Sequence, residues 1–347
     1  MQNSYQLLLQ NLKNGRKTLF ITHCGPNGIT KTVHDGNATA KWAGTDGREA
    51  ALHVDRHDDE ITLAEFFTPQ PRLIILGGGH IAAPLAAMGA MLNFDVVIFD
   101  DRPSFANRSR FPDAHEIICD YFESMTQRIA IRHNDYIAIV TRGHKHDLQC
   151  LNALLKIDIP CYIGMIGSSR RVGIVRRQML AEGYAAEDLE RLHAPIGIDI
   201  GAVTPEEIAV SIVAEMIQER RQRPAAKNGL TAGRYEGDFT DMGLLEWLAE
   251  KNDEKAAIIT VLSVKGSTPR GVGAKMGVLD NGRIVGSIGG GCAEADVVRE
   301  ARRIIRDGGY CCKIIDMIDS VEENGMVCGG VMEVLIEARR GKDSGPV

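Results

Sequence analysis

The chain has 347 residues, of which 44% are hydrophobic and 25% are charged, and these ordinary proportions exclude a disordered, collagenous or fibrous protein. Its formal net charge of −6 provides no general attraction to nucleic acid or to an anionic membrane, so we expect neither as a partner. The 8 cysteines are too dilute for a disulfide scaffold and the N-terminus lacks the pattern of a signal peptide, which predicts a cytoplasmic protein.

Residues 1–70 predict one short amphipathic helix followed by short strands. Tyr5, Leu8, Leu9 and Leu12 share a helical face, and Gly15 can end the helix. So few elements cannot bury a stable core of their own. We therefore expect residues 1–70 to complete another part of the chain.

Residues 71–221 alternate between apolar strands and helices, a pattern typical of a parallel sheet built from βαβ units. A helix is predicted after Thr204, with Pro205 at its first position and Glu207 completing a capping box. The fold class expected is α/β, with a Rossmann-like, doubly wound parallel sheet. Its strands are predicted at 73–76, 95–99, 116–119, 136–140 and 161–163.

A charged, glycine-rich linker is predicted at 222–240, and residues 241–340 return to a mixed α/β pattern. A helix at 243–250 and a strand at 256–264 precede a hairpin, in which both Asn281 and Gly282 tolerate a positive φ. A second helix runs from 292 to Gly308. We expect 1–70 and 241–340 to form one discontinuous domain, and a swapped homodimer is an alternative because the linker can reach a second copy.

A glycine-rich turn lies between the first strand and first helix of the Rossmann-like region. Gly77, Gly79 and Ala82 have the spacing of a dinucleotide-binding turn, in which small residues let the backbone approach a pyrophosphate. Asp100 ends the next strand, where an acidic residue accepts hydrogen bonds from ribose hydroxyls, so NAD is preferred over NADP. Arg102 weakens that preference, and a structural turn without a ligand is the alternative.

Two polar clusters follow later strands of the same region. His144, His146 and Asp147 come after the fourth strand, where we weigh a weak metal site against contact with a polar ligand and against a structural loop. The two histidines are two residues apart, which suits a loop or a strand. The Ser168–Arg171 segment starts another helix, either as a second anion site or as a solvated surface.

The last third of the chain contains two cysteines beside glycines. Cys292 follows Gly289, Gly290 and Gly291 at a predicted helix start, where the helix dipole and backbone amides stabilise a thiolate. Cys328 lies beside glycines as well. For each cysteine the alternative is a small buried side chain with a packing role.

Together these segments resemble the XdhC/CoxI family. The resemblance rests on GSTPRGVGAKMGVLDNGRIVGSIGGGCAEADVV (266–298), GMVCGGVMEVLIE (325–337) and the motifs RLIILGGGHIAAPLA, TRGHKHD and HAPIGIDIGAVTPEEIAVSI. It implies an accessory protein that binds molybdenum cofactor (molybdopterin), assists its sulfuration with a cysteine desulfurase, and delivers it to a molybdenum hydroxylase apo-enzyme such as xanthine dehydrogenase. No catalytic cycle of its own is implied.

The resemblance also implies cofactor-binding positions and a changed domain order. The implied residues are Gly266, Ser267, Arg270, Gly289, Gly290, Gly291, Cys292 and Cys328 in one portion, and Gly77, Gly79, His80, Asp100 and Asp101 in the Rossmann portion. Similar proteins carry the GSTPR…CGG portion first and the Rossmann portion last. Here the first portion stands at the end, as in a circular permutation.

Two other functions remain open from the sequence. An NAD(P)-dependent oxidoreductase would use the glycine-rich turn together with His144 or His146 as a proton relay. No set of nucleophile, base and orienting residue can be assembled to support it. A scaffold that brings desulfurase and apo-enzyme together is the third hypothesis.

Overall fold

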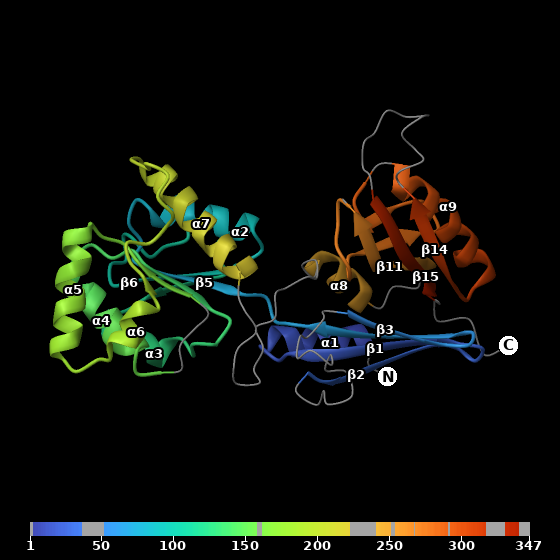
Figure 1. Cartoon of the computed structure of the whole chain (residues 1–347), viewed down its shortest axis with the longest axis horizontal. Helices are drawn as coiled ribbons and strands as arrows, with labels where there is room; N and C mark the ends of the chain where they lie inside the picture. The colour runs from blue at the N-terminus through green and yellow to red at the C-terminus, as the bar shows by residue number, and fades with distance from the viewer. Residues whose placement is uncertain are drawn as a thin grey trace. The chain divides into compact units, whose positions relative to one another are not determined.

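Two units make up the computed structural model: a continuous central unit (Gln70–Arg223) and a discontinuous unit assembled from Met1–Pro69 and Pro224–Val347 (Figure 1). The structure describes residues 3–36, 52–157, 162–222, 241–250, 254–266, 268–290, 292–316 and 330–339. The predicted linker lies outside these residues from 223 onward. Within the described ranges, none of the helices has both the length and the apolar character needed to cross a bilayer.

The central unit is built on a six-stranded parallel sheet with the order β10-β9-β8-β5-β6-β7. Numbered within the unit and taken from β7, this is the order 3-2-1-4-5-6 of dinucleotide-binding folds. The predicted α/β class is therefore confirmed. The strands are β5 (Arg72–Leu76), β6 (Asp95–Asp100), β7 (Glu116–Cys119), β8 (Tyr136–Ile139), β9 (Tyr162–Met165) and β10 (Leu192–His193).

Helices cover both faces of this sheet, because alternate residues of each strand are apolar on opposite sides. Ile74 and Leu76 pack against α3 to α6, whereas Leu73 and Ile75 pack against α2 and α7. Strands buried on both faces appear in the sequence as continuous apolar runs, which is why they were predictable. The helices are α2 (Ala82–Met91), α3 (Met125–Arg128), α4 (His144–Leu154), α5 (Ser169–Ala181), α6 (Ala186–Glu190) and α7 (Pro205–Gln222), with a 3₁₀ turn, η1 (Phe122–Ser124).

The capping box predicted for α7 is present. The hydroxyl of Thr204 accepts a hydrogen bond from the N–H of Glu207 at 3.2 Å, and the N–H of Thr204 donates to Glu207 Oε2 at 3.0 Å. Two orphan donors of the first turn are satisfied in this way. One strand differs from its prediction, since β9 continues to Met165 rather than ending at 163.

The first sheet of the discontinuous unit is antiparallel, with the order β2-β1-β4-β3, and is more regular than the short strands predicted from the sequence. Helix α1 (Ser4–Lys13) buries Tyr5, Leu8 and Leu12 as expected. Gly15 follows it with φ +73°. The strands are β1 (Thr18–Gly25), β2 (Gly28–Asp35), β3 (Leu52–His57) and β4 (Glu60–Phe67).

The second sheet of this unit has the order β13-β12-β11-β15-β14. The predicted hairpin is present, and of the two residues that tolerate a positive φ, Gly282 adopts one (+87°) and Asn281 does not. Asp280 to Gly282 form a three-residue loop that ends in one left-handed glycine. Strand β15, which the sequence analysis missed, lies between β11 and β14 in this sheet. The elements are α8 (Met242–Ala249), β11 (Ala256–Gly266), β12 (Lys275–Leu279), β13 (Ile284–Gly286), α9 (Cys292–Asp307), β14 (Tyr310–Asp316) and β15 (Gly330–Arg339).

Residues from both ends of the chain share one apolar core in the discontinuous unit. Tyr5, Leu8 and Phe20 pack with Leu248 and Ile258, so α1 and β1 contact α8 and β11. Two ion pairs of low exposure, Lys31–Glu337 and Lys275–Glu65, also connect the two sheets, each at 2.7 Å. The core that contains these residues is therefore formed by both ends of the chain together.

Candidate functional site

A glycine-rich turn joins β5 to α2 in the central unit. Gly77 has φ +115°, and its N–H donates to the carbonyl oxygen of Phe99 at 2.8 Å. A Cβ on Gly77 would lie 2.6 Å from the carbonyl oxygen of Val140, so a larger residue does not fit. A Cβ on Gly79 would meet no described atom within 4 Å. A tightly packed first glycine and an open second one together suit backbone approach to a phosphate.

The carboxylate of Asp100, at the end of β6, holds this turn from the protein side. The residue is 1% exposed, and Oδ2 accepts hydrogen bonds from the N–H of Gly78 (2.7 Å) and from Nη2 of Arg102 (2.9 Å). Oδ1 accepts from the N–H (3.0 Å) and Nε (2.8 Å) of Arg102. Asp100 therefore lies beside the glycine-rich turn, but its oxygens are bound to protein donors.

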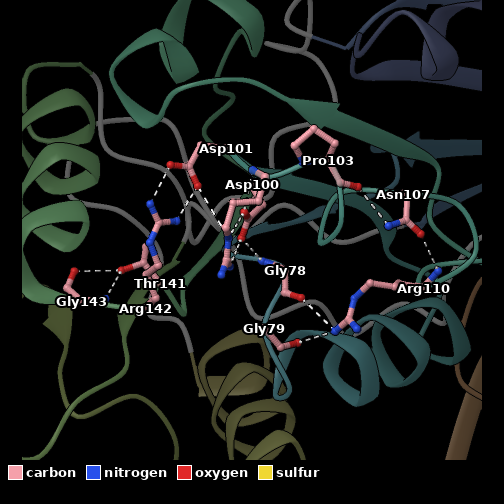
Figure 2. Close-up of polar contacts among 11 residues, drawn as sticks. Gly78, Gly79, Asp100, Asp101, Pro103, Asn107, Arg110, Thr141, Arg142 and Gly143 are labelled. Atoms are coloured by element: carbon pink, nitrogen blue, oxygen red, sulfur yellow. Dashed lines mark hydrogen bonds and ion pairs between the residues drawn. The ribbon is translucent and has the colours of Figure 1, made fainter.

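A second arginine contacts the same turn from the loop after β6. Arg110 Nη2 donates to the carbonyl oxygen of Gly78 at 3.1 Å, as Figure 2 shows. The loop is braced internally, because Asn107 accepts from the N–H of Arg110 and donates to the carbonyl of Pro103, both at 3.1 Å. His80, the exposed residue after Gly79, completes the turn. Sequence reasoning missed Arg110, because its spacing from the glycines does not indicate contact with them.

Asp101 links the ends of β6 and β8 through Arg142. The guanidinium makes two hydrogen bonds to the carboxylate, from Nη1 to Oδ1 at 2.5 Å and from Nη2 to Oδ2 at 2.8 Å (Figure 2). These bonds lower the pKa of Asp101 to about 2. The charged pair is therefore intact at neutral pH.

The Asp101–Arg142 pair should make the stability of the central unit depend on pH. Because the folded pKa is depressed, the contribution is present above the ordinary carboxyl pKa of about 3.9 and is lost as the pH falls towards about 2. Arg142 is 40% exposed, so solvent screening limits the contribution to about 1 kcal/mol. Urea unfolding of wild type and Asp101→Asn at pH 7, 5, 4 and 3 tests this expectation, with Arg142→Gln as the matched partner. An unchanged difference at the lowest pH would contradict it.

The weak metal candidates His144, His146 and Asp147 lie on a helix rather than in the predicted loop or strand. Helix α4 begins at His144, and side chains two residues apart on a helix point about 200° apart. His146 Nδ1 lies 2.9 Å from Gln149 Oε1, and its ring contacts Phe122. In the described part of the chain, no three His, Cys, Asp or Glu side chains are placed to hold a metal ion. The structure thus does not bring these three residues together as a ligand set.

Asp147 instead connects three segments at the carboxyl edge of the sheet. It is fully buried, and it accepts from the hydroxyl of Thr141 at 2.6 Å and from Arg171 Nε at 2.8 Å. Burial raises the pKa of Asp147 despite these bonds. Ser168 caps α5 by accepting from the N–H of Arg171 at 3.3 Å. Arg171 is therefore a partner of Asp147, whereas Arg170 is exposed.

The second glycine-rich turn precedes α9 in the discontinuous unit. Its amides bind a carboxylate of the protein itself: Glu294 Oε1 accepts from the N–H groups of Gly290 (2.8 Å) and Ile288 (3.1 Å) and from the hydroxyl of Ser287 (2.7 Å). The N–H of Gly289 donates to Ser287 Oγ at 3.0 Å. Burial opposes ionisation of Glu294, but these bonds outweigh it and lower its pKa. The amides of Gly289 and Gly290, which sequence analysis offered to an anionic cofactor, thus already have acceptors.

Sequence analysis missed Glu294, although the residue stands at a recognisable capping position of the predicted helix. It is the third residue of α9, where a Glu commonly bonds back to the amides before the helix. Gly289 also contacts the preceding turn, because a Cβ there would lie 2.7 Å from Pro269 Cγ. The turn that follows Gly266 and contains Arg270 is therefore adjacent to Gly289.

Several predicted site residues lie outside the described ranges. They are Ser267, Gly291 and Cys328, and the side chain of Cys292, whose backbone begins α9. The remaining residues predicted to bind a cofactor fall into two groups, one around the turn before α2 and one around the turn before α9. Each group belongs to a different unit.

Two family models match this chain, one in the central unit and one in the discontinuous unit. A model described as the XdhC Rossmann domain matches residues 73–216, and one described as the XdhC and CoxI family matches residues 249–314. The chain belongs to the XdhC and CoxI family. The Rossmann match comes first in this member, consistent with the permuted order described above.

The similarity to known relatives covers only part of each protein. A probable xanthine dehydrogenase subunit of Bacillus subtilis (strain 168) is 32% identical over 196 residues, or 56% of this chain and 57% of that protein. The uncharacterized protein YqeB of Escherichia coli (strain K12) is 33% identical over 156 residues, 45% of this chain and 28% of its own. A crystal structure of a xanthine dehydrogenase from Bacillus halodurans is 29% identical, with a TM-score of 0.49 over 62% of this chain and 65% of that one. The chain thus spans less than two thirds of each relative.

Proposed function

We propose that this XdhC and CoxI family member is an accessory protein of a molybdenum hydroxylase such as xanthine dehydrogenase. It would bind molybdenum cofactor, assist its sulfuration together with a cysteine desulfurase, and deliver it to the apo-enzyme. The observation that carries the proposal is the family match over both units, which includes the two glycine-rich turns. The name of the Bacillus subtilis relative supports the link to xanthine dehydrogenase.

The turn before α9 is the proposed site for the cofactor. Its donor set suits an anionic, sulfur-bearing group, because Arg270 lies on the turn adjacent to Gly289 and Cys292 begins the helix. Glu294 already occupies the amides of Gly290 and Ile288, so we assign charge recognition to Arg270 rather than to those amides. Molybdenum cofactor would supply its redox chemistry to the hydroxylase after transfer. This chain would bind the cofactor and shield it from solvent.

The turn before α2 is the proposed site for a nucleotide, or for a nucleotide-like end of the cofactor. Gly77 and Gly79 let the backbone approach phosphate groups, and His80 stands exposed beside them. Asp100 would act by holding Gly78 and Arg102 in place. Asp101 would fix Arg142 at the same edge of the sheet.

Purification from a host grown with ample molybdate tests the proposed function. Molybdenum and pterin should co-purify with the full chain in comparable amounts, as determined by elemental analysis and pterin fluorescence. Absence of both from chain prepared in this way would contradict the accessory role.

Cys292→Ser should weaken retention of molybdenum by about tenfold, the equivalent of about 1.4 kcal/mol of binding free energy. The reason is that a hydroxyl does not replace a thiolate as a soft ligand or sulfur acceptor. Cys312→Ser is the matched control, since Cys312 is exposed on β14 of the same unit. Equal molybdenum contents of the two variants would exclude Cys292 from the site.

An NAD(P)-dependent oxidoreductase is the second candidate, favoured by the strand order and the glycine-rich turn of the central unit. It predicts a bound dinucleotide that is reduced when a substrate is added. Bound molybdenum cofactor without such reduction favours the accessory protein. A protein that carries neither the dinucleotide nor molybdenum cofactor would favour the scaffold hypothesis.

A further inference from the structure

Asp100, the acidic residue at the end of β6, has no free acceptor site for a ribose hydroxyl. A carboxylate offers about four lone-pair sites. In Asp100, Oδ2 accepts from Gly78 and Arg102, and Oδ1 accepts twice from Arg102, at distances between 2.7 and 3.0 Å. With the residue only 1% exposed, a ribose hydroxyl would have to displace one of these donors. The usual reason for preferring NAD at such a turn is therefore missing.

Arg102 takes up three of the acceptor sites of Asp100 that a ribose diol would use, and its side chain is held from two sides. Its guanidinium carbon lies 3.6 Å from the centroid of the Phe105 ring, while Nε and Nη2 donate to Asp100. Nη2 and the N–H of Gly78 bond to the same oxygen of Asp100, which places the guanidinium directly beside the glycine-rich turn. The side chain is still 30% exposed. Only two of its five N–H groups donate to Asp100, so donors remain for a ligand.

The charge around the turn also favours an anion. Arg102, Arg110 and Arg142 lie against Asp100 and Asp101 or the carbonyls of the turn, so three guanidinium groups face two carboxylates. Arg110 contributes a cation whose described partners at the turn are neutral carbonyl oxygens, those of Gly78 and Gly79. A phosphate monoester accepts hydrogen bonds and carries negative charge, whereas a ribose diol needs an acceptor.

We propose that the turn before α2 takes an adenine dinucleotide whose ribose carries a 2′-phosphate, and that Arg102 recognises this phosphate. The inference rests on the proposed nucleotide site and reverses the preference for NAD expected from Asp100. Asp100 is a positioning residue, because it orients Arg102 and Gly78 without contacting the ligand. An arginine near the end of the second strand is the known device for 2′-phosphate recognition in this type of fold.

Isothermal titration of the full-length wild-type chain with NADP⁺ and with NAD⁺ tests the proposal. NADP⁺ should bind at least about tenfold more tightly, the ratio expected from one added charge-assisted contact. Adenosine 2′,5′-bisphosphate should compete with NADP⁺, whereas 5′-ADP should compete less. Equal or tighter binding of NAD⁺, or no binding of either dinucleotide, would overturn the proposal.

Two variants locate the preference. Arg102→Lys keeps a cation beside buried Asp100 but removes the planar fork, so it should reduce the ratio of NADP⁺ affinity to NAD⁺ affinity. Arg128→Gln is the control, because Arg128 also pairs with one aspartate, Asp120, on the surface of the same unit. If Arg102→Lys keeps the wild-type ratio of NADP⁺ to NAD⁺ affinity, Arg102 does not recognise the 2′-phosphate. Molybdenum content measured on the same preparations tests the accessory role separately, so the two failures are distinguishable.

Discussion

Glu337→Gln should lower the free energy of unfolding of the discontinuous unit by about 3–5 kcal/mol, because it leaves the ammonium group of Lys31 buried without a counter-charge. Lys31 Nζ lies 2.7 Å from both carboxylate oxygens of Glu337, whose side chain is 4% exposed. Burial lowers the pKa of Lys31, but Glu337 and Tyr5 outweigh burial and raise it, so the lysine is charged at neutral pH. The rings of Tyr5 and Phe20 flank the same cation.

Urea unfolding followed by tryptophan fluorescence measures this loss, because both tryptophans of the chain, one of them Trp247, belong to this unit. The double variant Lys31→Met with Glu337→Leu should recover most of it, because an apolar pair removes both buried charges. The exposed pair Lys13–Glu246 provides the matched control: it also joins the two ends of the chain, at 3.1 Å, with side chains 58% and 52% exposed. Glu246→Gln should therefore cost less than about 1 kcal/mol. Equal losses for Glu337→Gln and Glu246→Gln would show that burial does not govern this interaction.

Substitutions of two neighbouring glycines should separate folding from ligand binding in the central unit. Gly77→Ala should destabilise it by about 3 kcal/mol or more, because the new Cβ would lie 2.6 Å from the carbonyl oxygen of Val140 and φ is +115°. Gly79→Val should change stability by less than about 1 kcal/mol, since a Cβ there meets no described atom within 4 Å. It should nevertheless abolish nucleotide binding by filling the space that phosphate groups need.

Far-ultraviolet circular dichroism during urea unfolding reports the stabilities, and isothermal titration with NADP⁺ reports the binding. Both substitutions lie in the same turn, so a difference between the two variants does not come from their position in the fold. A Gly79→Val protein that binds nucleotide normally would exclude the turn as the phosphate site. A Gly77→Ala protein as stable as wild type would show that the backbone around Val140 yields at little cost.

Local patterns allowed the elements of the central unit to be predicted. Strands such as 73–76 and 95–99 are apolar on both faces, and the glycine-rich turn and the Thr204–Glu207 cap depend on residues close in sequence. The hairpin at Gly282 was predictable for the same reason, although the sequence did not distinguish which of Asn281 and Gly282 takes the positive φ. Strand β15 is harder to predict, because Glu333 and Glu337 interrupt the apolar run that is typical of a buried strand.

The family, the Rossmann-like fold class and the positions of both glycine-rich turns are predictable from the sequence, since these depend on short motifs and periodicity. What those turns bind within the protein depends instead on contacts between distant segments. Asp100 was expected to face a ribose and instead bonds to Gly78 and Arg102, and Glu294 occupies amides that had been assigned to a ligand. Lys31 and Glu337, 306 positions apart, meet in a core that neither end forms alone. Spacing shows which groups can donate or accept hydrogen bonds, but the fold decides which partners satisfy them first.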